Sequence, residues 1–356
     1  MPFTIAGGIK TENQAQFHPR KYIYGLVKAI EKNGGMIFNH SVVHDVKRIN
    51  NEYISYTDMY QIKSKYVVLC THYPFINFPG FYFSKMYQVT SYALGIETGQ
   101  NLFHGMYINA QEPALSFRTT NYQDKKLLIV AGGNHKTGYS PDSEEFYGYH
   151  FLEQEVKKIY PDYKILYQLN TRDCVTLDKI PYIGKFSDFT PNMYVATGFN
   201  KWGMTSSNVA ANIITDDILK VENEYANIYN STRFKPVKNK DELKNMTKQV
   251  FQSFVSNRIK IPAENLDVIK NDNGGIIKMN GTSVGIYKNN EGKIFTVDPT
   301  CTHLGCLLTW NNVDKTWDCP CHGSRFDYSG KNLYDPAFKD LKQYDIEDES
   351  HTDSNS

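Results

Sequence analysis

The sequence predicts an α+β protein of several domains, in which a mixed α/β domain precedes a small all-β domain. Helical and strand patterns alternate over residues 1–222, whereas short strands separated by Gly/Asn turns follow residue 261. The 356 residues exceed what one hydrophobic core usually organises. Because 40% of the residues are hydrophobic, the chain can build real cores, which excludes wholesale disorder.

The first domain, expected over residues 1–222, opens with a helix and continues with strands. Residues 16–30 place apolar side chains at helical spacing, and the Gly34-Gly35 pair ends the helix. Residues 36–46 then indicate strand material around a short turn, and residues 66–70 indicate a buried strand that leads into an aromatic loop.

The middle of this domain is expected to combine short strands with a helix near residues 143–159. Residues 192–196 form another short buried strand, which leads through a glycine-bearing turn into a helix ending near residue 219. Such a connection can present backbone N–H groups to the polar edge of a cofactor. From the pattern alone, an ordinary structural connection is the preferred interpretation.

Composition changes after Leu219. Residues 223–260 are expected to form a polar linker followed by an amphipathic helix, whose apolar face carries Leu243, Met246, Val250 and Phe254. Residues 261–346 form the all-β domain, with strands predicted at residues 275–279, 282–287 and 293–297. Residues 347–356 are acidic and polar, and we expect a disordered tail.

Charge and hydropathy exclude several classes of partner. The chain has 39 basic and 38 acidic residues, so nothing favours binding to nucleic acid. The longest uncharged stretch, residues 66–84, is interrupted by Pro74 and Pro79, which argues against a membrane span. Because no secretory signal pattern opens the sequence, we expect a cytoplasmic protein.

Two short segments carry the strongest chemical signal. CTHLGC spans Cys301–Cys306 and CPCHGS spans Cys319–Ser324. Each segment offers one cysteine and one histidine at close spacing, namely Cys301 with His303 and Cys319 with His322. Two thiolates and two imidazoles on two loops fit a metal centre, and structural zinc uses the same ligand types. Zinc pairs are usually separated by at least two residues, whereas only one residue separates Cys301 from His303.

One further cysteine remains in each segment. Cys321 lies between Cys319 and His322, the two candidate ligands of its own loop, so it does not easily join them in one tetrahedral set of metal ligands. A disulfide between Cys306 and Cys321 would tie the two loops together. Gly305 and Gly323 permit the tight turns that such loops need.

This pair of segments resembles the signature of Rieske proteins. The resemblance implies a [2Fe-2S] cluster in which Cys301 and Cys319 hold one iron and His303 and His322 hold the other. Each histidine would then keep a second ring nitrogen free, and the midpoint potential would fall as those nitrogens lose protons.

Residues around the two loops also match the Rieske pattern. Pro336, after the second loop, resembles the proline loop that shields the cluster, and Ser324 matches a serine that donates a hydrogen bond to a cluster sulfur. Phe326 stands where high-potential members have a tyrosine donor. Because a hydrogen bond to sulfur stabilises the reduced cluster, we expect a potential below the top of the Rieske range.

The first domain resembles FAD-dependent oxidoreductases of the D-amino-acid oxidase type. Residues 17–46 resemble that family's helix and strand leading to the adenine contact, residues 66–75 its strand and turn near the flavin, and residues 171–205 its C-terminal flavin-contacting segment. Together with the Rieske unit, the resemblance covers most of the chain. It implies FAD contacts at Val43, Thr71, Gly198, Gly203, Met204 and Thr205.

One departure from this family concerns the FAD pyrophosphate. The family opens with a Gly-x-Gly-x-x-Gly turn within a βαβ unit, and none of the 356 residues forms that motif. We therefore expect an N-terminally truncated flavoprotein domain, which puts FAD binding by this chain alone in doubt. A separate chain that supplies the missing segment is a candidate partner.

Two functions are compatible with these features. The first is FAD-dependent oxidation of a small amine-like or amino-acid-like substrate, with electrons passed from flavin to cluster and then to an unidentified acceptor. The alternative is a Rieske-type electron carrier attached to a catalytically silent flavoprotein scaffold.

No residue is assigned a catalytic role from the sequence. Among the isolated polar residues, His135 and Lys136 suit a solvated loop about as well as a site, and Arg172 is better explained by a structural salt bridge. Cys70 and Cys174 are most simply buried small residues.

Overall fold

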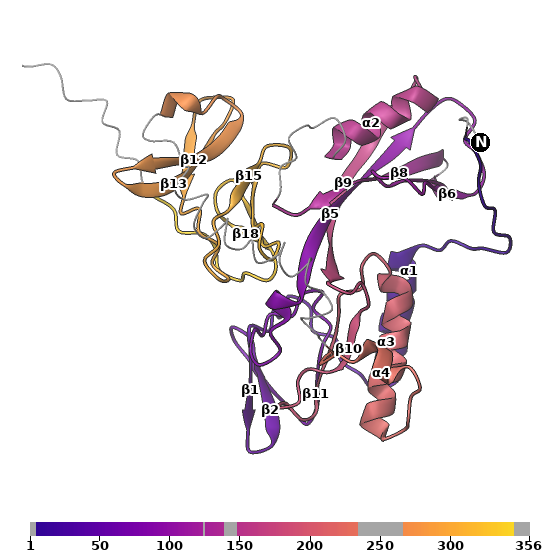
Figure 1. Cartoon of the computed structure of the whole chain (residues 1–356), viewed down its shortest axis with the longest axis vertical. Coiled ribbons are helices and arrows are strands. Elements are labelled where there is room, and N and C mark those ends of the chain that lie inside the picture. The colour runs from indigo at the N-terminus through magenta and orange to yellow at the C-terminus, as the bar shows by residue number, and fades with distance from the viewer. Residues whose placement is uncertain (1–4, 124, 139–147, 234–265, 345–356) are drawn as a thin grey trace, which may run out of the picture.

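The computed structural model describes residues 5–123, 125–138, 148–233 and 266–344, which form an N-terminal part up to Arg233 and a C-terminal part from Leu266 (Figure 1). The elements of the N-terminal part are α1 (Pro19–Lys32), β1 (Asp45–Ile49), β2 (Glu52–Tyr56), β3 (Gln61–Ser64), β4 (Val67–Leu69), η1 (Tyr82–Ser84), β5 (Met86–Glu97), β6 (Met106–Ile108), β7 (Leu115–Tyr122), β8 (Lys125–Lys136), α2 (Gly148–Ile159), β9 (Lys164–Thr176), β10 (Tyr182–Lys185), β11 (Met193–Thr197), α3 (Gly203–Leu219) and α4 (Ala226–Tyr229).

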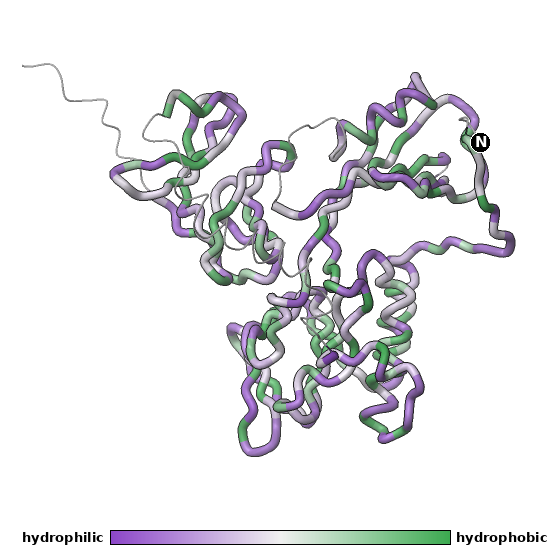
Figure 2. Tube along the Cα trace, in the orientation of Figure 1, coloured by the Kyte–Doolittle hydropathy of each residue, from purple (hydrophilic) through white to green (hydrophobic). Residues whose placement is uncertain are grey.

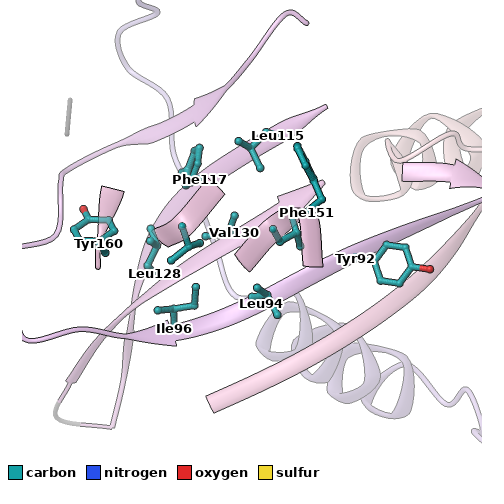
Figure 3. Packing of buried hydrophobic residues seen from close by; sticks show 11 residues of the cluster. Tyr92, Leu94, Ile96, Leu115, Phe117, Leu128, Val130, Phe151 and Tyr160 are labelled. Carbon is teal, nitrogen blue, oxygen red and sulfur yellow. The ribbon is translucent and has the colours of Figure 1, made fainter. Parts of the chain in front are cut away.

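A five-stranded antiparallel sheet of order β6-β7-β8-β5-β9 forms one half of the N-terminal part. Burial alternates residue by residue along β5, because successive side chains point to opposite faces of the sheet. The buried face packs against α2 around Leu94, Leu128, Val130 and Phe151 (Figure 3). Strands β5, β8 and β9 run 12, 12 and 13 residues, so the expectation of short strands here was wrong.

A second sheet, of order β10-β11-β4, belongs to the other half of the N-terminal part. β4 pairs in parallel with β11, so the carboxyl ends of these two strands lie at the same edge. Every residue of β11 is buried, as is usual for a strand covered on both faces. The separate β1-β2-β3 sheet contributes Tyr53 and Val46 to the hydrophobic core that contains Leu69 of β4 and Val195 of β11.

The helix expected near residues 16–30 is confirmed as α1, which begins with Pro19 in its first turn. The strand expected over residues 36–46 was wrong for residues 36–44, because β1 begins only at Asp45. Met36 and Phe38 remain exposed, and within the described residues no strand pairs with residues 36–43, while the N–H of His44 donates to the oxygen of Tyr56 at 3.0 Å. β-branched and aromatic residues form a strand only where a partner strand and a covered face exist.

Residues 223–233, the first part of the expected linker, pack on the N-terminal part. α4 contacts β10, and Ser231, which is fully buried, donates a hydrogen bond to the backbone oxygen of Lys185. Arg233 binds the Asp178 carboxylate through both Nε and Nη2, each at 2.9 Å. The remainder of that linker, the amphipathic helix and the acidic tail lie outside the described residues.

The C-terminal part consists of two small antiparallel sheets, of order β12-β13-β14 and β15-β16-β17-β18. This confirms the small all-β domain. Its strands are β12 (Asn273–Met279), β13 (Thr282–Lys288), β14 (Ile294–Val297), β15 (Thr309–Asn311), β16 (Thr316–Asp318), β17 (Arg325–Asp327) and β18 (Asn332–Tyr334).

The C-terminal part lies beside the middle of the molecule, next to the long strands β5 and β9 (Figure 1). Hydrophobic residues occur along both α1 and α3 (Figure 2), yet no residue of α1 is buried. None of the described helices is both long and apolar enough to cross a membrane.

Candidate metal centre

The two cysteine- and histidine-bearing segments are loops of equivalent construction. The first lies between β14 and β15, and the second between β16 and β17. The N–H of Gly305 donates to the oxygen of Cys301 at 2.9 Å, and the N–H of Gly323 donates to the oxygen of Cys319 at 3.0 Å. Both glycines have φ near +80°, a conformation that costs other residues about 1–2 kcal/mol.

The leftover cysteines join the two loops. Cys306 and Cys321 lie at disulfide distance, with an S–S separation of 2.13 Å and Cα atoms 6.5 Å apart. Cys301 and Cys319 are buried and carry free thiols. The sulfurs of Cys306, Cys319 and Cys321 fall within 4.8 Å of one another, so the disulfide borders the pair of free thiols.

The environment of Cys301 favours the charged thiolate. A hydrogen bond from the Cys319 thiol lowers the pKa of Cys301 to about 7 against the opposing effect of burial, and the backbone N–H groups of His303 and Leu304 act in the same direction. The Ser324 hydroxyl also hydrogen-bonds this sulfur, while Ser324 Oγ accepts the N–H of Ala337 at 3.1 Å. A thiolate is the form in which cysteine binds metal.

Both histidines present one buried ring nitrogen without a protein partner. Nδ1 of His303 and Nδ1 of His322 are buried and accept or donate no hydrogen bond within the described residues. The two rings lie 5.1 Å apart, nearly perpendicular. Burial lowers the pKa of His303 to about 4, and burial together with the charges of His303 and Lys136 lowers that of His322 to about 3. Neutral imidazoles with one orphaned nitrogen fit metal ligation.

The other ring nitrogen of each histidine is bound to the N-terminal part. Nε2–H of His303 donates to Asn77 Oδ1 at 3.0 Å, and the His322 ring hydrogen-bonds the backbone of Phe83. His322 is only 4% exposed. Each histidine thus has a second ring nitrogen besides the unpartnered Nδ1, as expected, but that nitrogen is hydrogen-bonded to residues 70–84, which cover the histidine side of the loops.

Aromatic rings and close backbone contacts complete this cover. The ring centroids of Tyr73 and Phe83 lie 6.2 and 6.0 Å from that of His322. A Cβ atom on Gly323 would meet Gln88 Oε1 at 2.2 Å, and one on Gly138 would meet Pro320 Cα at 2.4 Å. The two parts thus approach at glycines, where no side chain separates them.

The residues expected to contact FAD gather mainly at one sheet edge. Thr71 follows the carboxyl end of β4, and Gly198 follows that of β11, the strand paired with it. Gly203, Met204 and Thr205 form the first turn of α3, which starts shortly after Gly198. Carboxyl ends of parallel strands, next to a helix N-terminus, are where ligands bind in such sheets. Val43 lies apart from this edge in sequence, two residues before β1.

Several isolated residues differ from their sequence interpretation. Arg172 is 5% exposed, but it forms no salt bridge within the described residues, and its guanidinium lies 4.6 Å from the Tyr334 ring centroid instead. Cys70 is exposed rather than buried, whereas Cys174 is buried as expected. His135 receives a contact from the Tyr92 hydroxyl at 2.9 Å.

Sequence reasoning missed Tyr73, Asn77, Phe83 and Gln88. All four follow β4 and lie within or next to the aromatic loop that the sequence places there. The density of aromatic residues in that loop was the available signal, since exposed aromatic clusters are typical of binding surfaces.

Comparison with known proteins identifies both parts. The profile of the FAD-dependent oxidoreductase family matches residues 1–217, and that of the Rieske [2Fe-2S] domain matches residues 260–345. The chain is 37% identical to the "Putative Rieske 2Fe-2S iron-sulfur protein YhfW" of Bacillus subtilis over 94% of its own length. It spans 66% of that relative.

Two further likenesses are limited to one part each. The cytochrome b6-f complex iron-sulfur subunit of Chlorobaculum tepidum is 37% identical over 22% of this chain and 42% of its own length. L-proline dehydrogenase from P. horikoshii superposes with a TM-score of 0.51 at 20% identity, covering 61% of this chain and 59% of that enzyme. The latter likeness concerns the fold alone.

Proposed function

Because the chain belongs to the FAD-dependent oxidoreductase family of the D-amino-acid oxidase type and carries a Rieske [2Fe-2S] domain, we propose that it couples flavin-dependent oxidation to this cluster. The substrate is a small amine-like or amino-acid-like molecule. When bound, FAD supplies hydride acceptance and the cluster supplies one-electron transfer. The ligands are Cys301 and Cys319 for one iron and His303 and His322 for the other.

The observation that carries the cluster assignment is the state of these four side chains. Two thiols remain outside the neighbouring disulfide, and two imidazoles have buried, unpartnered Nδ1 atoms. A buried polar atom without a partner is costly unless something else binds it. The Cys306–Cys321 disulfide supports the arrangement because it joins the two ligand loops.

The cluster assignment is tested by iron and sulfide analysis with EPR of the reduced protein. We expect two irons and two sulfides per chain and a Rieske-type signal, which Cys301→Ser abolishes. Cys70→Ser is the matched control, since this exposed cysteine should leave cluster content unchanged. A colourless protein with stoichiometric zinc would contradict the assignment.

The parallel pair β4 and β11 supports the flavin side of the proposal. Thr71 and Gly198 follow these strands at one edge, and the first turn of α3 directs backbone N–H groups toward the same region. Gly198 has a φ of +73°, and a Cβ there would meet Thr176 Cγ2 at 2.4 Å, so the turn depends on glycine. These residues would orient the polar edge of the isoalloxazine ring.

We propose that a Gly-x-Gly-x-x-Gly segment beyond these 356 residues, in the same polypeptide or in a separate chain, completes the FAD site. β4 stands at the edge of its sheet, and Val68 within it is 43% exposed. On α1, Tyr22, Ile23, Leu26 and Ile30 are all at least 40% exposed. An uncovered parallel edge and an uncovered apolar helix are both surfaces that a βαβ unit can cover.

Flavin content distinguishes the oxidoreductase from the electron carrier. We expect FAD, released on denaturation, to co-purify only when the Gly-x-Gly-x-x-Gly segment is expressed with these residues, either fused to them or as a separate chain. Leu26→Asp should reduce that FAD content without changing iron content, whereas the control Phe189→Asp, at a side chain 83% exposed, should change neither. A reducible cluster with no flavin under both conditions would favour the carrier function.

A further inference from the structure

Both histidines of the proposed cluster are held at their outer nitrogens by one short segment of the N-terminal part. Asn77 Oδ1 lies 3.0 Å from His303 Nε2, and the backbone of Phe83 is hydrogen-bonded to His322. Because both Nδ1 atoms are unpartnered, these bonds leave Nδ1 available for iron. Nε2 then carries the ring proton, so it donates to Asn77.

The same segment excludes solvent from the histidine edge. Tyr73 is fully buried, and its ring packs beside that of His322. Phe75 contacts Phe338, with ring centroids 5.5 Å apart. Gly323 lies against the buried Gln88. Side chains of the N-terminal part therefore enclose the His322 ring, whereas His303 is half-buried.

We propose that Asn77 is a positioning residue of the metal centre, which holds His303 by its Nε2–H and keeps the histidine edge closed to any external electron carrier. This inference rests on the proposed cluster ligands. The edge instead faces the loop after β4, in which the N–H of Tyr73 donates to the oxygen of Thr71 at 2.7 Å. Tyr73, two residues after Thr71 of the proposed flavin edge, has its ring centroid 6.2 Å from that of His322.

The Asn77 bond should also affect the cluster potential. An acceptor at Nε2–H increases the electron density of the imidazole and makes it a stronger ligand, which favours the oxidised iron. Removal of the Asn77 acceptor should raise the midpoint potential of the cluster. Replacement of Asn77 by a carboxylate should lower this potential, because charged acceptors form stronger hydrogen bonds. If the two substitutions only loosened the contact, the midpoint potential would shift in the same direction in both variants.

The test compares Asn77→Leu and Asn77→Asp in the full chain by protein-film voltammetry. We expect the midpoint of Asn77→Leu above, and that of Asn77→Asp below, the unchanged protein. Asn121→Leu, at an exposed position of β7, is the matched control and should leave the midpoint unchanged. Shifts of the same sign in both variants, or no shift, would overturn the role of Asn77 while the cluster assignment stands.

A second measurement tests the closed edge directly. Hydroxyl radicals oxidise solvent-accessible imidazole rings through their carbon atoms, without requiring a free nitrogen lone pair, and peptide mass spectrometry reads each site. We expect His303 to react at least tenfold more slowly than His44, whose side chain is 42% exposed, and Asn77→Leu to accelerate the reaction at His303. Equal rates at His303 and His44 in the unchanged protein would overturn the closed edge. Iron content and EPR of the same samples report separately on the proposed function, and a chain without cluster would overturn both.

Discussion

Arg325 binds Asp318 through two parallel hydrogen bonds in the interior of the C-terminal part. Nε lies 2.7 Å from Oδ1 and Nη2 lies 3.1 Å from Oδ2, and both side chains are less than 6% exposed. Against burial, which raises it, the guanidinium lowers the pKa of Asp318. Nη1 of the same arginine donates to Asn170 Oδ1 at 3.0 Å, so this ion pair also joins the two parts.

Arg325→Leu should therefore strongly destabilise the protein. Removal of one partner leaves the Asp318 carboxylate buried and uncompensated, which costs about 3–5 kcal/mol. Guanidinium denaturation followed by near-UV circular dichroism measures the loss. The control is Lys63→Met, which breaks an exposed pair with Glu52 and should cost under about 1 kcal/mol. Equal losses in the two variants would contradict a buried, paired role for Arg325.

Phe326→Tyr should raise the midpoint potential of the cluster. Phe326 is fully buried in the core that contains Cys301 and Cys319, so an added hydroxyl would lie close to the cluster sulfurs. A hydrogen bond to sulfur stabilises the more negative, reduced state. Voltammetry should find the midpoint unchanged for Phe295→Tyr on β14. A midpoint at or below that of the unchanged protein would contradict the effect.

Gly323→Ala should destabilise the protein by more than the backbone strain of the substitution, because Gly323 lies at the contact between the two parts. Alanine at a φ of +82° costs about 1–2 kcal/mol, and its Cβ would also meet the Gln88 side chain. Gly281 is the matched control, because its φ is +78° and nothing lies within 4 Å of its Cβ position.

Thermal unfolding should thus show a larger decrease in Tm for Gly323→Ala than for Gly281→Ala. Truncation of the neighbour in the Gln88→Ala, Gly323→Ala double variant should recover part of the difference. If the two single variants lose the same Tm, the close approach at Gly323 contributes nothing beyond the turn itself.

The stability of the N-terminal part should rise between about pH 8 and pH 10.5. Burial, together with the nearby charge of Arg233, lowers the pKa of Lys85 from 10.5 to about 8. In this interval the unfolded chain binds the Lys85 proton and the folded chain does not, so the free energy of unfolding increases with pH. Below pH 8 the ammonium is protonated in both states and the folded state carries the cost of burying it.

Lys85→Met should remove this contribution and stabilise the protein at pH 7. The measurement is the free energy of unfolding from urea titrations across pH 7–10.5, and Lys28→Met, an exposed lysine on α1, controls for the loss of one positive charge. A slope that persists in Lys85→Met would assign the pH dependence to other groups.

The sequence alone was sufficient to predict the two loops of the proposed metal centre. Cys301, His303, Cys319 and His322, and the Cys306–Cys321 pair, lie on two loops whose turns are closed by local bonds from Gly305 and Gly323. Spacings of a few residues determine such loops, so the pattern of residue types carries most of the information. The short strands of the C-terminal part were predictable for the same reason.

Only the tertiary structure decided what covers that centre. Asn77 and His303 are 226 residues apart, and no periodicity or turn signal in either segment encodes their contact. The same holds for Arg172, which lies over the Tyr334 ring, and for residues 36–43, which pair with no strand among the described residues. Contacts between distant segments depend on how two separately folded parts pack, because burial and hydrogen-bond satisfaction are properties of the assembled surface rather than of the local chain.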